Sequence, residues 1–384
     1  MPRREQEQWM ARALALAEKG RFSVSPNPKV GACVVLRGRL VGTGYHQVYG
    51  GPHAEPVALA KAGKRARGAT LYVTLEPCAT WQKTPPCAPL IERQGIRSVV
   101  IGCLDPNPLN RGKGVRYLRR AGISVTHGVL EKEVRKQNEG FFRFMTSGRP
   151  FVTLKMAQTL DGKIATEEGL SRWISSPSSR KFVHRLREDH DAVLVGKNTF
   201  YLDDPRFTLP KGSRAFRAGK PWKVVLVSEK GWPERARIFR DHRLTLLVFS
   251  EKNLKNVVTR AGTRPGSSVL LPVKEAKGKI SVPDLLKKLA GLGVTKLLVE
   301  GGGELAWSFL EANCVDRAVW IVAPKIFGGR NAKTSVEGPG VRTPQEAFIF
   351  NPESITQCGE DWVLQGNFQK RKTKVGRHHV HGHR

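Results

Sequence analysis

Three potential metal ligands and one carboxylate lie close together in the first third of the chain. His53 and Glu55 occur in GPHAEPVAL, and Cys78 and Cys87 follow in TLEPCATWQKTPPC. Zinc in proteins takes about four ligands, most often Cys sulfur or His nitrogen, and a catalytic zinc keeps one position for water. His53, Cys78 and Cys87 would supply three ligands, and Glu55 could sit beside the water and move protons. The pattern predicts a catalytic zinc site of the kind found in zinc-dependent deaminases.

The elements that must position these residues follow from the hydrophobic pattern. Strands are predicted at 30–36, 40–46, 69–75, 97–105 and 123–130, and helices at 54–63, 88–95, 114–122 and 131–148. His53 would open one helix, and Cys78 would follow the end of a strand. Cys33 and Cys103 stand in apolar runs and are predicted to be buried strand residues. The alternation of strands and helices indicates an α/β sheet with helices on its faces.

The pattern restarts near residues 146–150 and predicts a second α/β region. Strands are expected to begin at 151 and to cover 191–196, 223–228, 243–250, 295–300 and 315–329, with helices at 176–190 and 303–313. The stretch 203–221 is predicted to be a loop. We expect a first domain at 1–147 that carries the zinc site, a second domain at 150–366 and a basic, disordered tail at 367–384.

The motifs of the first domain resemble those of the bifunctional riboflavin biosynthesis proteins. These proteins combine a diaminohydroxyphosphoribosylaminopyrimidine deaminase with a 5-amino-6-(5-phosphoribosylamino)uracil reductase. The resemblance rests on NPKVGACVV, GYH, GPHAEPVAL and TLEPCATWQKTPPC, whose cysteine spacing is longer than the C-x-x-C of most zinc deaminases. It implies a cytidine-deaminase-like three-layer fold, a Zn²⁺ cofactor and substrate contacts from Asn27, His46 and Lys83.

The second domain resembles the reductase half of the same family through LKMAQTLDGKIAT, SRWISSP, DAVLVGKNTFYLDDPRFTLP and LLVEGGGELAWSFLEANCVD. The resemblance implies a dihydrofolate-reductase-like fold and NADPH-dependent reduction of the ribosyl group, giving 5-amino-6-(5-phosphoribitylamino)uracil. Arg187 is expected to clamp the substrate phosphate with paired hydrogen bonds. The family's cofactor positions fall on Ala157, Trp173, Thr199, Asp203, Ser228 and the run from Gly302, and its substrate positions on Lys155, Ser171, Arg187, Arg206 and Glu300.

The chain departs from the family pattern at four positions. Thr80 and Gln82 stand where the family has His and Gly, and Trp81 could replace the contact of that His. Pro210 replaces an Arg that contacts phosphate, and Val227 replaces an Asp in the cofactor strand. These changes leave open an alternative, a deaminase with a degenerate reductase half.

Composition bears on the location of the protein, on its cysteines and on its partners. The 384 residues carry a net charge of +32 and six cysteines, and they contain no apolar run that predicts a membrane span or a secretory signal. We therefore expect a cytoplasmic enzyme without a disulfide framework, and expect it to form homo-oligomers. The positive charge keeps an RNA-binding nucleobase deaminase as an alternative, but nucleic acid is not the expected partner, because such an enzyme would not need the second domain.

Overall fold

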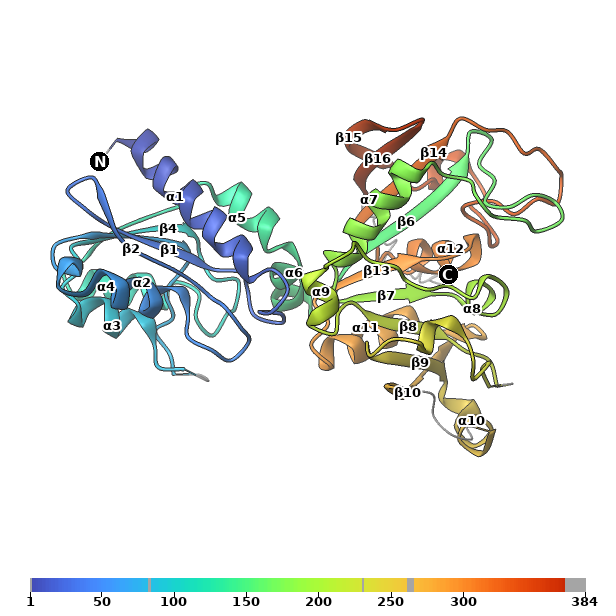
Figure 1. Ribbon diagram of the computed structural model, residues 1–384, viewed down its shortest axis with the longest axis horizontal. Coiled ribbons are helices and arrows are strands. Elements are labelled where there is room, and N and C mark those ends of the chain that lie inside the picture. The colour runs from blue at the N-terminus through green and yellow to red at the C-terminus, as the bar shows by residue number, and fades with distance from the viewer. Residues whose placement is uncertain (1, 82–83, 230, 261–265, 370–384) are drawn as a thin grey trace, which may run out of the picture.

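A computed structural model describes residues 2–81, 84–229, 231–260 and 266–369. Two α/β units follow each other along the chain and lie side by side (Figure 1). The first unit ends with helix α6 (Glu139–Ser147), and the second begins with strand β6 (Phe151–Thr159). Within these residues, we find no helix that combines the length and the apolar character needed to cross a membrane.

The first unit is built on a five-stranded sheet in the order β2-β1-β3-β4-β5. The central strand β3 is buried along its whole length. Strand β1 pairs antiparallel with β2 and β3, whereas β3, β4 and β5 are parallel. The strands are β1 (Gly31–Leu36), β2 (Arg39–Tyr45), β3 (Thr70–Leu75), β4 (Ser98–Cys103) and β5 (Ser124–His127).

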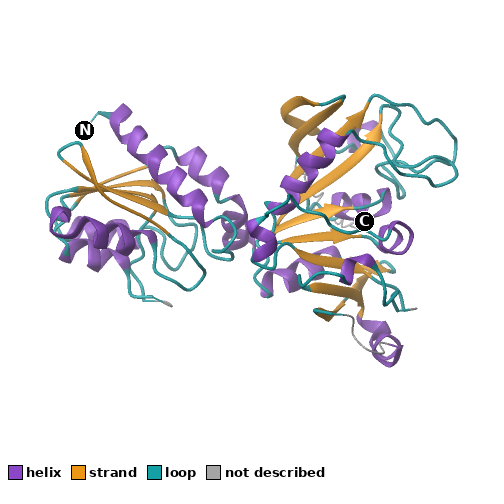
Figure 2. Cartoon of the chain, viewed as in Figure 1, coloured by secondary structure: helices purple, strands orange, loops and turns teal. Residues whose placement is uncertain are grey.

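Helices cover both faces of this sheet and form three layers (Figure 2). One face packs on α1 (Arg3–Ala17), whose Met10 and Ala13 contact buried strand residues that include Cys33. The opposite face packs on α2 (Ala54–Ala62), α3 (Cys87–Arg93) and α4 (Lys113–Arg120). Cys33 and Cys103 are fully buried strand residues, as predicted.

The prediction of one helix over 131–148 was wrong. Two helices, α5 (Glu131–Gln137) and α6, meet at Asn138. The side chain of Asn138 accepts a hydrogen bond from the backbone N–H of Lys29 at 2.8 Å and donates one to its carbonyl at 2.9 Å. These two hydrogen bonds hold Asn138 against Lys29, at the point where one helix ends and the next begins.

The second unit contains a nine-stranded sheet in the order β10-β9-β8-β7-β13-β6-β14-β16-β15. Seven strands from β10 to β14 are parallel, and the β15–β16 hairpin adds an antiparallel edge. The further strands are β7 (Ala192–Val195), β8 (Trp222–Leu226), β9 (Thr245–Ser250), β10 (Ser268–Val273), β13 (Lys296–Glu300), β14 (Arg317–Ala323), β15 (Phe350–Cys358) and β16 (Asp361–Phe368), with a small hairpin of β11 (Glu275–Ala276) and β12 (Lys279–Ile280).

Helices again lie on both faces of the sheet. Helices α11 (Val282–Gly291) and α12 (Gly303–Glu311) cover one face through a core of leucines and Phe309. Helix α7 (Pro177–Glu188), α8 (Lys197–Asp203) and α10 (Leu254–Arg260) lie on the other. The predicted loop at 203–221 is irregular except for the end of α8 and the short helix α9 (Arg214–Arg217).

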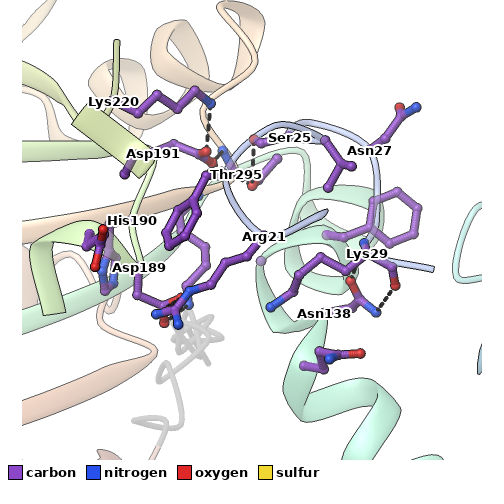
Figure 3. A pocket seen from close by; sticks show the side chains of 18 residues that line it. Arg21, Ser25, Asn27, Lys29, Asn138, Asp189, His190, Asp191, Lys220 and Thr295 are labelled. Carbon is purple, nitrogen blue, oxygen red and sulfur yellow. Dashed lines mark hydrogen bonds and ion pairs between the residues drawn. The ribbon is translucent and has the colours of Figure 1, made fainter. Parts of the chain in front are cut away.

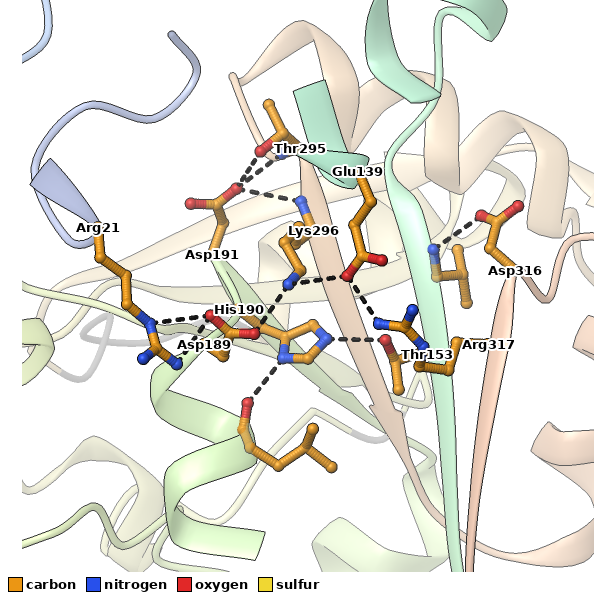
Figure 4. Close-up of polar contacts among 12 residues, drawn as sticks. Arg21, Glu139, Thr153, Asp189, His190, Asp191, Thr295, Lys296, Asp316 and Arg317 are labelled. Carbon is orange, nitrogen blue, oxygen red and sulfur yellow. Dashed lines mark hydrogen bonds and ion pairs between the residues drawn. The ribbon is translucent and has the colours of Figure 1, made fainter. Parts of the chain in front are cut away.

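Charged side chains join the two units beside α6 (Figure 4). Lys296 Nζ lies 2.9 Å from Asp189 Oδ2 and 3.2 Å from Glu139 Oε1. Glu139 also binds Arg317 at 2.8 Å, and Arg21 from the first unit reaches Asp189 at 2.8 Å. The members of this network are partly buried, and removing one partner would leave a charge without full compensation, so the network helps to fix how the two units meet.

Candidate active sites

The three predicted metal ligands come together at one end of the first sheet. His53 precedes α2 as its N-cap, Cys78 follows β3, and Cys87 is the first residue of α3. His53 Nδ1 lies 3.6 Å from Cys78 Sγ and 3.3 Å from Cys87 Sγ, and all three ligand atoms lie within 4.8 Å of one another. The backbone N–H of Ala88 donates to the Cys78 carbonyl at 3.0 Å and closes the loop between the cysteines.

The chemistry of these donors fits zinc. Hydrogen bonds from the Cys87 thiol and from His53 lower the pKa of Cys78 to about 4. In turn, the hydrogen bond to Cys78 raises the pKa of His53 to about 9. These hydrogen bonds favour the thiolate form of Cys78, which is the form that binds a metal ion. One imidazole and two sulfurs are a preferred donor set of Zn²⁺.

Glu55 lies beside this cluster and outside the group of ligand atoms. It is in the first turn of α2, its side chain forms a hydrogen bond with Cys87, and it is only 3% exposed. Burial raises the pKa of its carboxyl group. A carboxylate in this position can exchange protons with a reacting group next to the sulfurs.

A second buried carboxylate, Glu76, holds the loops behind the cysteines and was not predicted. Its two oxygens accept backbone N–H groups from Asp105 at 3.2 Å, Gly112 at 2.9 Å and Val115 at 3.2 Å. A buried acid that replaces water with three N–H donors is well satisfied. The signal was an acidic residue directly after an apolar strand, in LEPC.

Asn27 and His46 meet at the side of a cavity that reaches His53. Asn27 Nδ2 lies 3.1 Å from His46 Nε2, and His46 Nδ1 lies 2.9 Å from the carbonyl of Pro52. Burial lowers the pKa of His46 and favours the neutral ring. A neutral ring that donates from Nδ1 accepts the Asn27 amide at Nε2, which leaves Oδ1 of Asn27 for a ligand. The cavity has a volume of about 490 Å³ and is also lined by Thr84.

The loop between Cys78 and Cys87 contains further positions that the sequence singled out. Lys83 and Gln82 lie outside the described residues. Trp81 is 73% exposed, and Thr84 Oγ1 lies 3.3 Å from His53 Nε2. Thr84 thus fixes the imidazole whose other nitrogen faces the cysteines.

Three predicted substrate residues of the second unit form one buried cluster. Glu300, at the end of β13, pairs with Arg187 through two bonds of 2.7 and 2.8 Å, and Lys155 Nζ lies 3.8 Å from the same carboxylate. Burial alone would raise the pKa of Glu300, but the charges of Arg187 and Lys155 lower it to about 2. Burial lowers the pKa of Lys155.

Arg187 differs from a free phosphate clamp. Two of its guanidinium nitrogens bind Glu300, and the third donates to the carbonyl of Thr208 at 3.3 Å. Its side chain is 16% exposed, so it is not part of a solvated helix face. Arg206 lines a separate cavity together with arginines that include Arg237 and Arg243.

The predicted cofactor positions gather at the carboxyl edge of the second sheet, where α/β sheets bind ligands. They follow β6, β7, β8 and β13, except Ala157, which lies inside β6. Ser171 Oγ lies 3.5 Å from Asp203 Oδ1, and Ser228 Oγ lies 3.2 Å from the Tyr201 hydroxyl. Trp173 is 64% exposed and lies under the guanidinium of Arg180. Thr199 lies in α8, and Gly302 is the N-cap of α12.

This edge is suited to a phosphate-bearing cofactor. Among the residues that the structure describes, no side chain caps α12, and an added Cβ at Gly302 would find its nearest neighbour at 4.0 Å, on Ile164. The first N–H groups of the helix can therefore approach a ligand phosphate. Val227, where the family has Asp, is 8% exposed and belongs to the apolar core beside α8.

Comparison with known proteins finds a family match for each half of the chain. The RibD C-terminal domain matches residues 150–364, and the cytidine and deoxycytidylate deaminase zinc-binding region matches residues 3–103. The riboflavin biosynthesis protein RibD of Aquifex aeolicus is 44% identical over 365 residues, which cover 95% of this chain and 99% of the relative.

Solved structures give the same result over nearly the whole chain. Acinetobacter baumannii RibD superposes with a TM-score of 0.83 at 31% identity and covers 96% of this chain and 99% of its own. A diaminohydroxyphosphoribosylaminopyrimidine deaminase/5-amino-6-(5-phosphoribosylamino)uracil reductase of Thermotoga maritima has a TM-score of 0.79 at 36% identity, with 96% and 99% covered. The chain therefore belongs to the RibD family of bifunctional riboflavin biosynthesis enzymes, with a zinc-dependent deaminase domain followed by an NADPH-dependent reductase domain.

Proposed function

We propose that this chain catalyses two consecutive reactions. The first domain would hydrolyse the amine of 2,5-diamino-6-(5-phosphoribosylamino)pyrimidin-4-one. The second would reduce the ribosyl group of the product with NADPH and form 5-amino-6-(5-phosphoribitylamino)uracil. The observation that carries this proposal is the buried Glu55 beside the His53, Cys78 and Cys87 donors.

In the deaminase, His53, Cys78 and Cys87 would hold the zinc ion, which when bound lowers the pKa of water and makes it a nucleophile near neutral pH. Glu55 would take a proton from the attacking water and deliver it to the leaving amine. Its burial keeps bulk water from exchanging that proton during the reaction. Asn27, held by His46, would orient the pyrimidine ring through its Oδ1.

In the reductase, NADPH would supply the hydride, and the chain would hold the open-chain sugar against it. The N-terminus of α12 at Gly302 would bind a cofactor phosphate. Lys155 and Arg187 would attract the phosphorylated substrate, and Glu300 would fix both cations. Since Arg187 is engaged by Glu300, the phosphate would bind its outer edge or displace the Thr208 carbonyl.

A coupled assay tests the proposal. Purified enzyme would be given the diaminopyrimidine and NADPH, with ammonia release and NADPH oxidation followed separately. We expect one ammonia to be released before each NADPH is oxidised. NADPH oxidation with no ammonia release would contradict the deaminase assignment. Ammonia release without NADPH oxidation, also on the deaminated intermediate, would favour the degenerate-reductase alternative.

The cytoplasmic location, the homo-oligomeric state and the disorder of the tail at 367–384 stay predictions. Cell fractionation tests the first, light scattering of the purified enzyme the second, and limited proteolysis the third.

A further inference from the structure

The cavity at the deaminase site has walls from both domains. Asn27, His53 and Thr84 line it on the deaminase side, together with Phe144 and Met145 of α6. Residues 290–293, at the C-terminal end of α11 in the reductase domain, line it on the other side.

Gly291 is a glycine that neither backbone conformation nor packing explains. Its φ lies outside the left-handed region, and an added Cβ would have no atom within 4 Å. Among the glycines that the structure describes, Gly291 alone combines these two properties. Beside it, Leu292 is a large apolar residue that is 46% exposed. The wall thus offers open space and an uncovered apolar side chain at a cavity that contains His53.

The loop that carries Asn27 is held against the same wall. A Cβ built on Gly293 would lie 3.7 Å from Cγ of Pro26. Ser25 Oγ lies 3.5 Å from Thr295 Oγ1, which donates to Asp191 Oδ2 at 2.7 Å (Figure 3). The end of α11 and the Asn27 loop therefore keep a fixed relation to each other.

We propose that the C-terminal end of α11 is part of the deaminase substrate site, with Gly291 and Leu292 contacting the ribosyl part of the substrate. This inference rests on the proposed deaminase function. The reacting ring must lie near His53 and Glu55, so the rest of the substrate extends into the cavity. The C-terminal end of a helix carries partial negative charge, which favours the uncharged sugar over the phosphate. Leu292 can pack on the C–H face of that sugar.

The deaminase site is thus assembled from both domains of one chain. In this arrangement a residue of the reductase domain controls how well the first substrate binds, although it contributes nothing to proton transfer. Substitutions at the wall should therefore act on KM more than on kcat.

Gly291→Phe and Leu292→Ala test this proposal against Lys287→Phe. Lys287 is exposed one turn earlier on the same side of α11 and does not line the cavity. Deamination kinetics would be measured by ammonia release. Gly291→Phe should raise KM at least about tenfold, and Leu292→Ala about three- to tenfold, whereas Lys287→Phe should stay within about twofold of the unchanged enzyme.

Zinc content and NADPH oxidation on the deaminated intermediate show whether each variant is folded. Leu292→Ala, a truncation at a half-exposed position, keeps the test valid if the larger side chain at Gly291 disturbs folding. An unchanged KM in folded Gly291→Phe and Leu292→Ala, or an equal rise in Lys287→Phe, would overturn the proposal. Absence of ammonia release from the unchanged enzyme would instead contradict the proposed function.

Discussion

Replacing Glu55 with Gln separates proton transfer from metal binding. Gln has nearly the same size and can still form hydrogen bonds, but it does not exchange a proton near neutral pH. The three ligand atoms that would hold zinc belong to His53, Cys78 and Cys87. The substitution therefore leaves the donor set complete and removes one chemical step.

The surroundings of Glu55 set the size of the effect. The side chain is 3% exposed, so bulk water has little access to replace it. The nearby buried acid Glu76 is engaged by three backbone N–H groups and is not free to substitute. We therefore expect the full general acid–base contribution to be lost, a fall in kcat of about 10²- to 10⁴-fold. This corresponds to about 3–5 kcal/mol of transition-state stabilisation.

The assay compares Glu55→Gln with Glu92→Gln, a matched change on the outer surface of α3, where Glu92 binds Tyr117. Ammonia release, zinc content by mass spectrometry, and NADPH oxidation on the deaminated intermediate would be measured for both. We expect only Glu55→Gln to lose ammonia release, with zinc and reductase activity retained. Loss of zinc from Glu55→Gln would make Glu55 a ligand, and a rate within tenfold of the unchanged enzyme would refute its role in proton transfer.

Three further outcomes follow from the same geometry. Cys87→Ser should lower the zinc content and abolish ammonia release while NADPH oxidation on the deaminated intermediate continues; full zinc occupancy would exclude Cys87 as a ligand. Glu300→Gln should reduce stability by about 3–5 kcal/mol in denaturant unfolding, because Arg187 and Lys155 lose their buried partner, and should raise the KM of reduction; an unchanged midpoint would contradict this. His190 is buried, and burial lowers its pKa from 6.5 to about 4, so the unfolded chain takes up its proton first as the pH falls. Stability should therefore decrease between about pH 6.5 and pH 4, by up to about 3 kcal/mol, and this loss should be smaller in His190→Gln; equal pH profiles would contradict it.

The zinc site was accessible from sequence because its ligands border strongly patterned elements. His53 precedes α2, Cys78 follows the fully buried β3, and Cys87 begins α3. The role of Glu76 could not be predicted from sequence, because the backbone N–H groups that it binds lie up to 39 residues further along the chain. A pattern in a short window carries no information about such a contact.

In the reductase domain, too, local sequence patterns predicted some elements and missed others. Short apolar strands such as β7 were predicted, but the β15–β16 hairpin was missed because polar, exposed residues make up much of β15. Helix α11 was missed although Ser281 caps it and accepts the N–H of Asp284. The ion pair of Arg187 with Glu300 joins residues 113 positions apart. The approach of α11 to the deaminase cavity depends on how the two domains pack, which no local pattern encodes.

The most direct test of the central claim is the metal content of active enzyme, measured together with both activities before and after chelation. We predict about one zinc per chain, with chelation abolishing ammonia release, sparing NADPH oxidation on the deaminated intermediate, and being reversed by added zinc. Enzyme that releases ammonia at full rate without a stoichiometric transition metal would contradict the assignment of His53, Cys78 and Cys87.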